Sequence, residues 1–167
     1  AGYAVTGLAL SWTIASMMTS HIHGQMAMRS IVIGQSLCLI GLAGMALAIT
    51  DLPFSVIVTL NVVVGAGLGS SNLHLVEASM RYAPGGEQTT TAGAIPTIRS
   101  LGIAFGSAGA GVIANKAGLT DALAYDDVAR ATQWVLGIGA LAPLFAMICA
   151  MRFVRMVSVQ PKPVAAD

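Results

Sequence analysis

Long apolar stretches, separated by short polar turns, make up most of this chain. Five of them are expected to form helices, at about residues 2–20, 30–49, 52–82, 90–114 and 128–151. A helix needs roughly 20 mainly apolar residues to cross about 30 Å of hydrocarbon. No stretch shows the sustained two-residue alternation of a membrane β-strand. The pattern therefore predicts an all-α fold, a polytopic membrane helical bundle with five transmembrane helices.

The polar residues between these stretches are typical of turns. Asp51 is expected to cap the helix that follows it, and Pro53 suits the first turn of that helix. The longest polar connection, residues 115–130, is predicted to hold a short surface helix at about 121–125. Residues 1–156 then form the transmembrane part, and residues 157–167 are expected to be a cytoplasmic tail.

The composition supports a membrane setting. Of the 167 residues, 56% are hydrophobic and only 9% are charged, whereas a soluble domain carries about 25% charged residues. Five nearly uncharged helices would leave a soluble bundle without enough polar surface. The formal net charge of +1 offers no surplus for binding nucleic acid. Cys38 and Cys149 both lie in apolar runs and are interpreted as small buried hydrophobic residues rather than a disulfide.

The beginning of the sequence suggests a fragment. It starts Ala1-Gly2-Tyr3 without Met, and no basic segment precedes the first apolar run, which argues against a signal peptide. We therefore expect further N-terminal helices of the same protein to be partners of this chain, together with the lipid bilayer.

The basic residues predict an orientation. Five crossings place the chain ends on opposite sides of the membrane, with an unequal division of basic residues: Arg29, Arg81, Arg152, Arg155 and Lys162 on one side, and Lys116 and Arg130 on the other. Positive residues favour the cytoplasmic side. The C-terminus is therefore expected in the cytoplasm of a multi-pass protein of the cell (inner) membrane, with Arg29 in a cytoplasmic loop.

Glycines and prolines predict packing faces and kinks. Small residues spaced at i, i+4 let two helix backbones approach closely in lipid, and five glycines fit this role: Gly65, Gly69, Gly102, Gly106 and Gly109. Each proline inside a helix removes one backbone hydrogen bond and is expected to kink the helix, which concerns Pro96 and Pro143.

Two charged residues lie inside the apolar stretches. Arg99 lies about nine residues into its helix, where an arginine costs about 2.5–3.5 kcal/mol on insertion scales. Glu77 is its nearest acidic candidate, on the preceding helix. Two interpretations stay open: a charge pair that lines a substrate or proton pathway, or a structural pair of residues that reach toward the interface.

Three further polar residues are candidates for the same pathway. His74 is one turn from Glu77, and histidine changes charge near neutral pH. Asn72 lies in the same region, and Asn61 lies near the middle of the same helix. Each could equally serve as a hydrogen-bonding link between helices. No catalytic set and no metal-ligand spacing is found, so we expect no enzyme activity, no metal and no cofactor.

Three blocks of sequence resemble the multidrug-efflux (drug:proton antiporter) branch of the major facilitator superfamily. The first is the Trp- and Ser-containing run 7–16, and the second is the loop 21–29, which keeps Gly24 and Arg29 of the family's basic motif but lacks its acidic residue. The third begins at Gly65, passes through the Pro-Gly-Gly-Glu turn at 84–87 and ends at Gly111.

The resemblance implies that the chain is the C-terminal half of such a transporter and supplies the last five of its 12 or 14 helices. It also implies proton-coupled exchange of a small amphipathic substrate by alternating access of two half-bundles. Arg99 stands where relatives often have another polar residue. The alternative is a non-transporting membrane scaffold or assembly subunit, in which the polar residues only hold helices together.

Overall fold

The computed structural model describes residues 2–48, 53–121 and 124–159, and all regular structure in these ranges is helical. The α-helices are α1 (Gly2–Thr19), α2 (Gln25–Ala48), α3 (Phe54–Arg81), α4 (Gln88–Lys116), α5 (Tyr125–Gly139) and α6 (Leu141–Val159). A single 3-10 turn, η1 (Leu119–Asp121), precedes α5. The predicted all-α class is confirmed.

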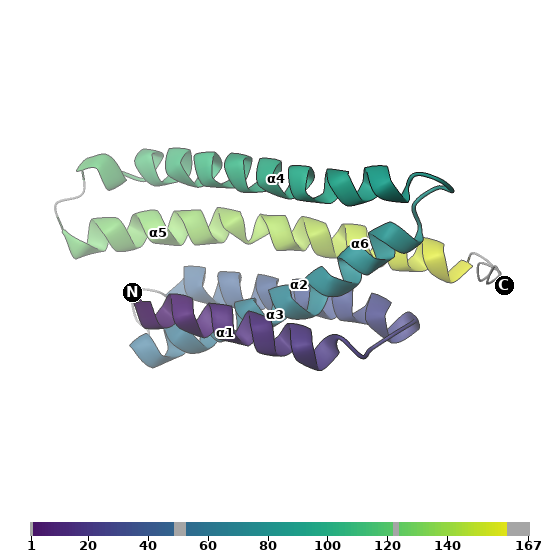
Figure 1. Cartoon of the computed structure of the whole chain (residues 1–167). Helices are drawn as coiled ribbons and strands as arrows, with labels where there is room; N and C mark the ends of the chain where they lie inside the picture. The colour runs from purple at the N-terminus through teal and green to yellow at the C-terminus, as the bar shows by residue number, and fades with distance from the viewer. Residues whose placement is uncertain (1, 49–52, 122–123, 160–167) are drawn as a thin grey trace.

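The helices lie side by side, and consecutive helices other than α5 and α6 run in opposite directions (Figure 1). α1, α2 and α3 form one group, α5 and α6 follow each other in line above it, and α4 lies outermost. The α1–α2 turn, the α3–α4 turn and the C-terminus lie at the same end. This end therefore collects the basic residues that the sequence assigns to one side, except for Lys162, which is outside the described residues.

Helix α3 packs against α1 through glycines. A Cβ atom added at Gly65 would collide with the carbonyl oxygen of Leu8, and one added at Gly69 would collide with that of Trp12. The Ser16 hydroxyl donates a hydrogen bond to the Gly69 carbonyl over 3.1 Å. The contact between these helices is thus made partly by backbone, which only residues without a side chain permit.

The opposite face of α3 packs equally closely on α2. A Cβ at Gly34 would lie 2.5 Å from the carbonyl oxygen of Gly67, and a Cβ at Gly67 would lie 2.5 Å from the carbonyl oxygen of Gly34. Farther along, a Cβ at Gly41 would collide with the Val64 side chain. Helix α3 is therefore held between two neighbours, and its buried residues all lie between Val64 and Ala78.

Helix α4 differs from the other long helices. None of its residues is buried, and a Cβ at Gly102, Gly106 or Gly109 would have no atom within 4 Å. No described helix therefore packs on these glycines, although the sequence predicts them to form a packing face. Pro96 lies inside α4, which continues through it as one helix.

The last predicted helix, 128–151, is instead two helices. α5 ends at Gly139 and α6 begins at Leu141. Pro143 lacks the N–H that would bond to the Gly139 carbonyl, and its ring disturbs the preceding turn. The sequence predicts a kink at Pro143, and the structure interrupts the helix at Ala140, three residues before this proline. α6 then continues to Val159, three residues into the predicted tail, and residues 160–167 lie outside the described part.

Four of the five predicted crossing helices are matched by stretches of sufficient length in the described residues. Four described stretches are long and apolar enough to cross a membrane: Gln25–Leu47, Phe54–Arg81, Gln88–Lys116 and Tyr125–Met156. The described apolar part of α1, Val5–Thr19, is shorter. α2 begins five residues before the predicted start because Gln, Met, Ala and Arg are all good helix formers.

Candidate functional site

The polar side chains of the second half of α3 form the candidate site. Asn72, His74, Glu77 and Arg81 follow one another along this helix, and Arg99 approaches them from α4. The rest of both helices is mainly apolar, which is why their few polar groups stand out. An ionisable residue within a membrane segment is a functional candidate with a partner to be identified.

Glu77 lies between two basic side chains of its own helix. One carboxylate oxygen accepts a hydrogen bond from Arg81 Nη2 at 2.7 Å, and the other lies 3.8 Å from His74 Nδ1. The carboxylate and the guanidinium are partly exposed, at 38% and 50% of their side-chain surface. From the sequence alone Arg81 is a charge at the helix end, although its i, i+4 spacing from Glu77 is the signal of an ion pair.

His74 is the most unusual member of the site. Its side chain is only 1% exposed, and neither ring nitrogen has a hydrogen-bond partner within the described residues. Buried polar groups in native proteins are nearly always hydrogen-bonded, so an exception calls for an explanation. The carboxylate of Glu77 is within reach of a small side-chain movement.

Arg99 and Glu77 have different partners. Arg99 Nη2 donates a hydrogen bond to Asn72 Oδ1, which links α4 to α3. Among the ion pairs of the described residues, Glu77 pairs with Arg81 and His74 and not with Arg99. The hypothesis of a Glu77–Arg99 charge pair is therefore replaced by two separate contacts on neighbouring helices.

The remaining candidates lie apart from this cluster. Asn61 Nδ2 contacts Met45 Sδ of α2 at 3.3 Å and the Ile57 carbonyl at 2.9 Å, so it links α3 to α2. Arg29 is exposed in the first turns of α2. No group of His, Cys, Asp or Glu in ranges 2–48, 53–121 and 124–159 has the arrangement of a metal site. Asp51, the predicted cap, is outside those ranges.

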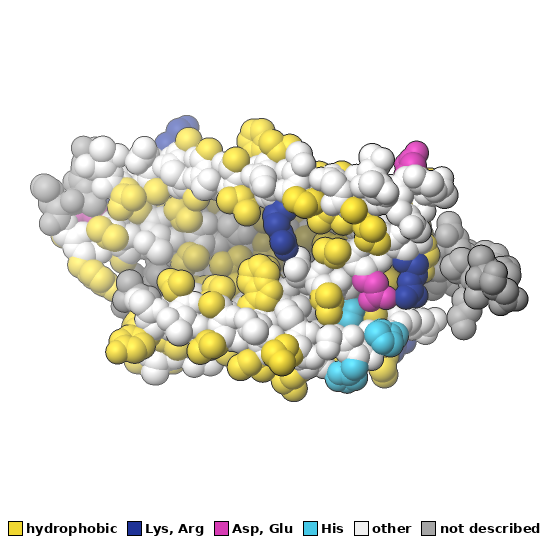
Figure 2. All heavy atoms as spheres, in the orientation of Figure 1, with side chains coloured by type: hydrophobic (Ala, Val, Ile, Leu, Met, Phe, Trp, Pro, Cys, Tyr) yellow, Lys and Arg dark blue, Asp and Glu magenta, His cyan; other side chains and the backbone are white. Residues whose placement is uncertain are grey.

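The charged groups have a clear distribution over the surface. In Figure 2, histidines and most acidic and basic side chains of the visible face gather toward the end that holds the C-terminus. Hydrophobic side chains cover much of the length between the two ends. At the charged end, the ring of Tyr82 after α3 meets that of Phe153 of α6 edge-on, with centroids 5.8 Å apart. The arrangement is compatible with helices that cross a membrane.

No family model, no curated protein and no solved structure matches this chain. The description of the site therefore depends on the geometry of its own residues.

Proposed function

We propose that this chain is part of a secondary transporter of the cell membrane that exports a small amphipathic compound in exchange for protons. The observation that carries the proposal is the buried imidazole of His74, without a hydrogen-bond partner and 3.8 Å from the carboxylate of Glu77. Membrane helices seldom keep ionisable groups, and those that persist often mark ion or substrate pathways.

The pair His74–Glu77 offers a place for a coupled proton. When His74 binds a proton, the imidazolium attracts the carboxylate that Arg81 now holds at 2.7 Å. Glu77 then has two cations competing for it, and its interaction with Arg81 weakens. In this proposal proton binding changes the charge distribution of α3 at the level where α4 is attached through Asn72 and Arg99.

The alternating-access part of the proposal draws on the resemblance to the major facilitator superfamily. Helix α4 presents glycines that no described helix covers, and the remaining helices of a larger transporter could pack there. The basic residues gathered at the C-terminal end support a cytoplasmic position for that end. In this view the exported compound passes beside α3 and α4, whose polar side chains supply the contacts.

The test uses the natural full-length protein in sealed vesicles with an imposed proton gradient and a panel of fluorescent amphipathic dyes. Glu77→Gln and His74→Gln are expected to lower gradient-driven dye export about tenfold or more, because each removes a member of the proton site. Glu87→Gln is the matched control: it neutralises a carboxylate in the α3–α4 turn and should leave export unchanged.

Two results would contradict the proposal. Gradient-independent dye distribution with the natural protein would favour the scaffold alternative. Unchanged export in folded Glu77→Gln and His74→Gln would remove the site assignment, even if the protein transports.

A further inference from the structure

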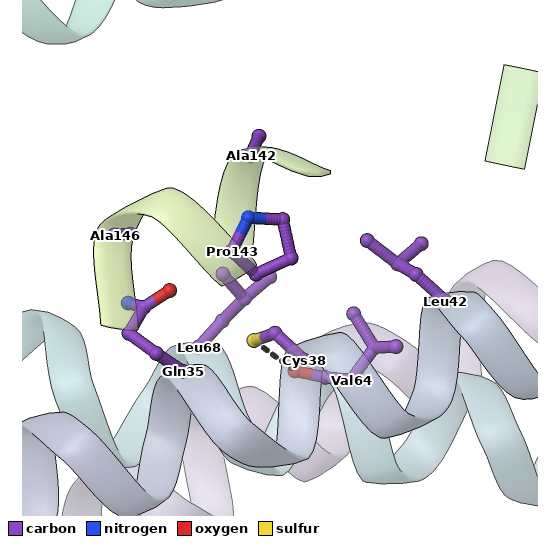
Figure 3. Close-up of a pocket in the computed structure, with 8 residues that line it drawn as sticks. All are labelled: Gln35, Cys38, Leu42, Val64, Leu68, Ala142, Pro143 and Ala146. Carbon is purple, nitrogen blue, oxygen red and sulfur yellow. Dashed lines mark hydrogen bonds between the residues drawn. The ribbon is translucent and has the colours of Figure 1, made fainter. Parts of the chain in front are cut away.

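A cavity of about 310 Å³ opens between α2, α3 and the first turns of α6, away from the polar site (Figure 3). Gln35, Cys38 and Leu42 of α2 form one wall, and Leu68 of α3 lies behind them. Pro143 of α6 faces Cys38 from the other side. The volume is at the lower end of the range of small-molecule sites, about 300–1,000 Å³.

The start of α6 forms one side of this space. α6 begins two residues before Pro143, and its first turns carry the small side chains of Ala142 and Ala146 over the cavity. Directly after them α6 is attached to α2, because the Ser36 hydroxyl contacts Met147 Sδ at 3.2 Å. The two helices are therefore held together beside the cavity, while the alanines leave it open.

The wall of the cavity is almost entirely apolar, and Gln35 carries its one side-chain amide. No charged side chain lines it. The Cys38 thiol already contacts the Val64 carbonyl, with 3.6 Å between sulfur and oxygen. Gln35 Nε2 donates a long hydrogen bond of 3.4 Å to the Ser71 hydroxyl, and the Gln35 amide oxygen has no hydrogen-bond partner in the described part of the chain. A ligand with a donor group could supply that partner.

The cavity lies near the middle of α2, at the depth of the hydrocarbon if this helix spans a membrane. A charged ligand would lose its hydration there without gaining an opposite charge. We propose that the cavity binds a small uncharged molecule with an apolar body and one hydroxyl group, which enters from the bilayer and donates to the Gln35 amide oxygen. This inference rests on the cavity alone and does not depend on the proposed transport.

Photolabelling of the natural full-length protein in phosphatidylcholine vesicles tests the proposal. The probe is a benzyl alcohol that carries a trifluoromethyl-diazirine, and adducts are mapped by mass spectrometry. We expect adducts to concentrate on the cavity segments of α2 and α6. An excess of 2-naphthol should reduce them about tenfold more effectively than naphthalene, which lacks the hydroxyl donor.

Three variants locate the effect. Ala146→Phe should fill the cavity and abolish the concentrated labelling, whereas Ile148→Phe, at an exposed position of the same helix, should not. Gln35→Leu keeps the shape of the wall and should make 2-naphthol and naphthalene equal competitors, and this variant decides the matter if Ala146→Phe does not fold.

Three results would overturn the inference. They are labelling spread evenly over lipid-facing helices, labelling unaffected by Ala146→Phe in folded protein, and equal competition by 2-naphthol and naphthalene in the natural protein. The last result would mean that the hydroxyl group contributes nothing to binding. Because photolabelling needs no flux, a negative transport assay leaves this test intact.

Discussion

The α1–α3 group and helix α4 use the same kind of sequence in opposite ways. Both α3 and α4 carry glycines spaced one turn apart, and both are long and apolar. In α3 those glycines bring the backbones of α1 and α2 within contact distance. In α4 they face open space, and the helix has no buried residue.

The difference shows that spacing of small residues encodes the ability to pack, not the presence of a partner. A glycine without a neighbour still carries the cost of backbone freedom in a helix, about 0.5–1 kcal/mol relative to alanine. In α3 close helix contact offsets that cost. In α4 nothing among the described residues does, so the two helices should respond oppositely to the same substitution.

The largest effect is expected from Gly65→Ala. The new Cβ collides with backbone at Leu8, which cannot move aside like the end of a long side chain. Overpacking of this kind typically costs about 1–3 kcal/mol, and the upper end applies here. Unfolding by added SDS in mixed micelles, followed by tryptophan fluorescence, measures it. A loss below about 0.5 kcal/mol would show that α1 and α3 are not in close contact.

A smaller effect is expected from the link that attaches α4 to α3. Asn72→Leu, Arg99→Leu and the double variant form a double-mutant cycle. Because a hydrogen bond to a charged group contributes about 1.5–3 kcal/mol and Arg99 is exposed, we expect a coupling energy near 1 kcal/mol. The same unfolding assay measures it. Additive single losses would mean that the two side chains do not interact.

Gly106→Ala makes in α4 the same substitution that Gly65→Ala makes in α3. No atom lies within 4 Å of the added Cβ, so the helix gains from alanine and the free energy of unfolding should rise by about 0.5–1 kcal/mol. The SDS unfolding titration used for Gly65→Ala, applied to this chain, measures the change. A marked loss in the natural full-length protein would instead reveal that another helix covers α4 there.

The smallest effect is expected from Arg81→Gln. The ion pair with Glu77 is at an exposed helix end, and pairs at i, i+4 contribute about 0.3–0.5 kcal/mol. We expect a loss of that size, which decreases further as salt is added because exposed charges are screened. A loss that persists at high salt would place this pair in a more buried setting.

Much of the helical layout could be predicted from the sequence. The predicted 52–82 and 90–114 correspond to Phe54–Arg81 and Gln88–Lys116 because long apolar runs with a Pro-Gly-Gly turn between them have few alternatives. The last helix was harder, since hydropathy is continuous across Gly139–Pro143. Pro143 predicts a kink in this helix, but only the backbone geometry shows that α5 ends at Gly139 and α6 begins at Leu141.

The sequence names Asn72, His74, Glu77 and Arg99 as candidates, but it misses Arg81 and does not give the partner of Arg99. His74 and Glu77 are neighbours by helical spacing alone, so their approach follows from the sequence. The partner of Arg99 depends on how far α4 is shifted along α3, and no sequence pattern states that shift. Gln35 and Cys38 were recognisable as polar or small residues of α2, but the cavity they line is formed by three helices.

The backbone contact between Gly34 and Gly67 has a consequence for motion. Where side chains meet, a helix can slide or roll by exchanging one set of rotamers for another. Where main chain meets main chain, as at 34 and 67 and again at 65 and 69 against α1, there are no rotamers to exchange. We therefore expect the three helices to move together, with rearrangement at their borders with α4 and with α5 and α6.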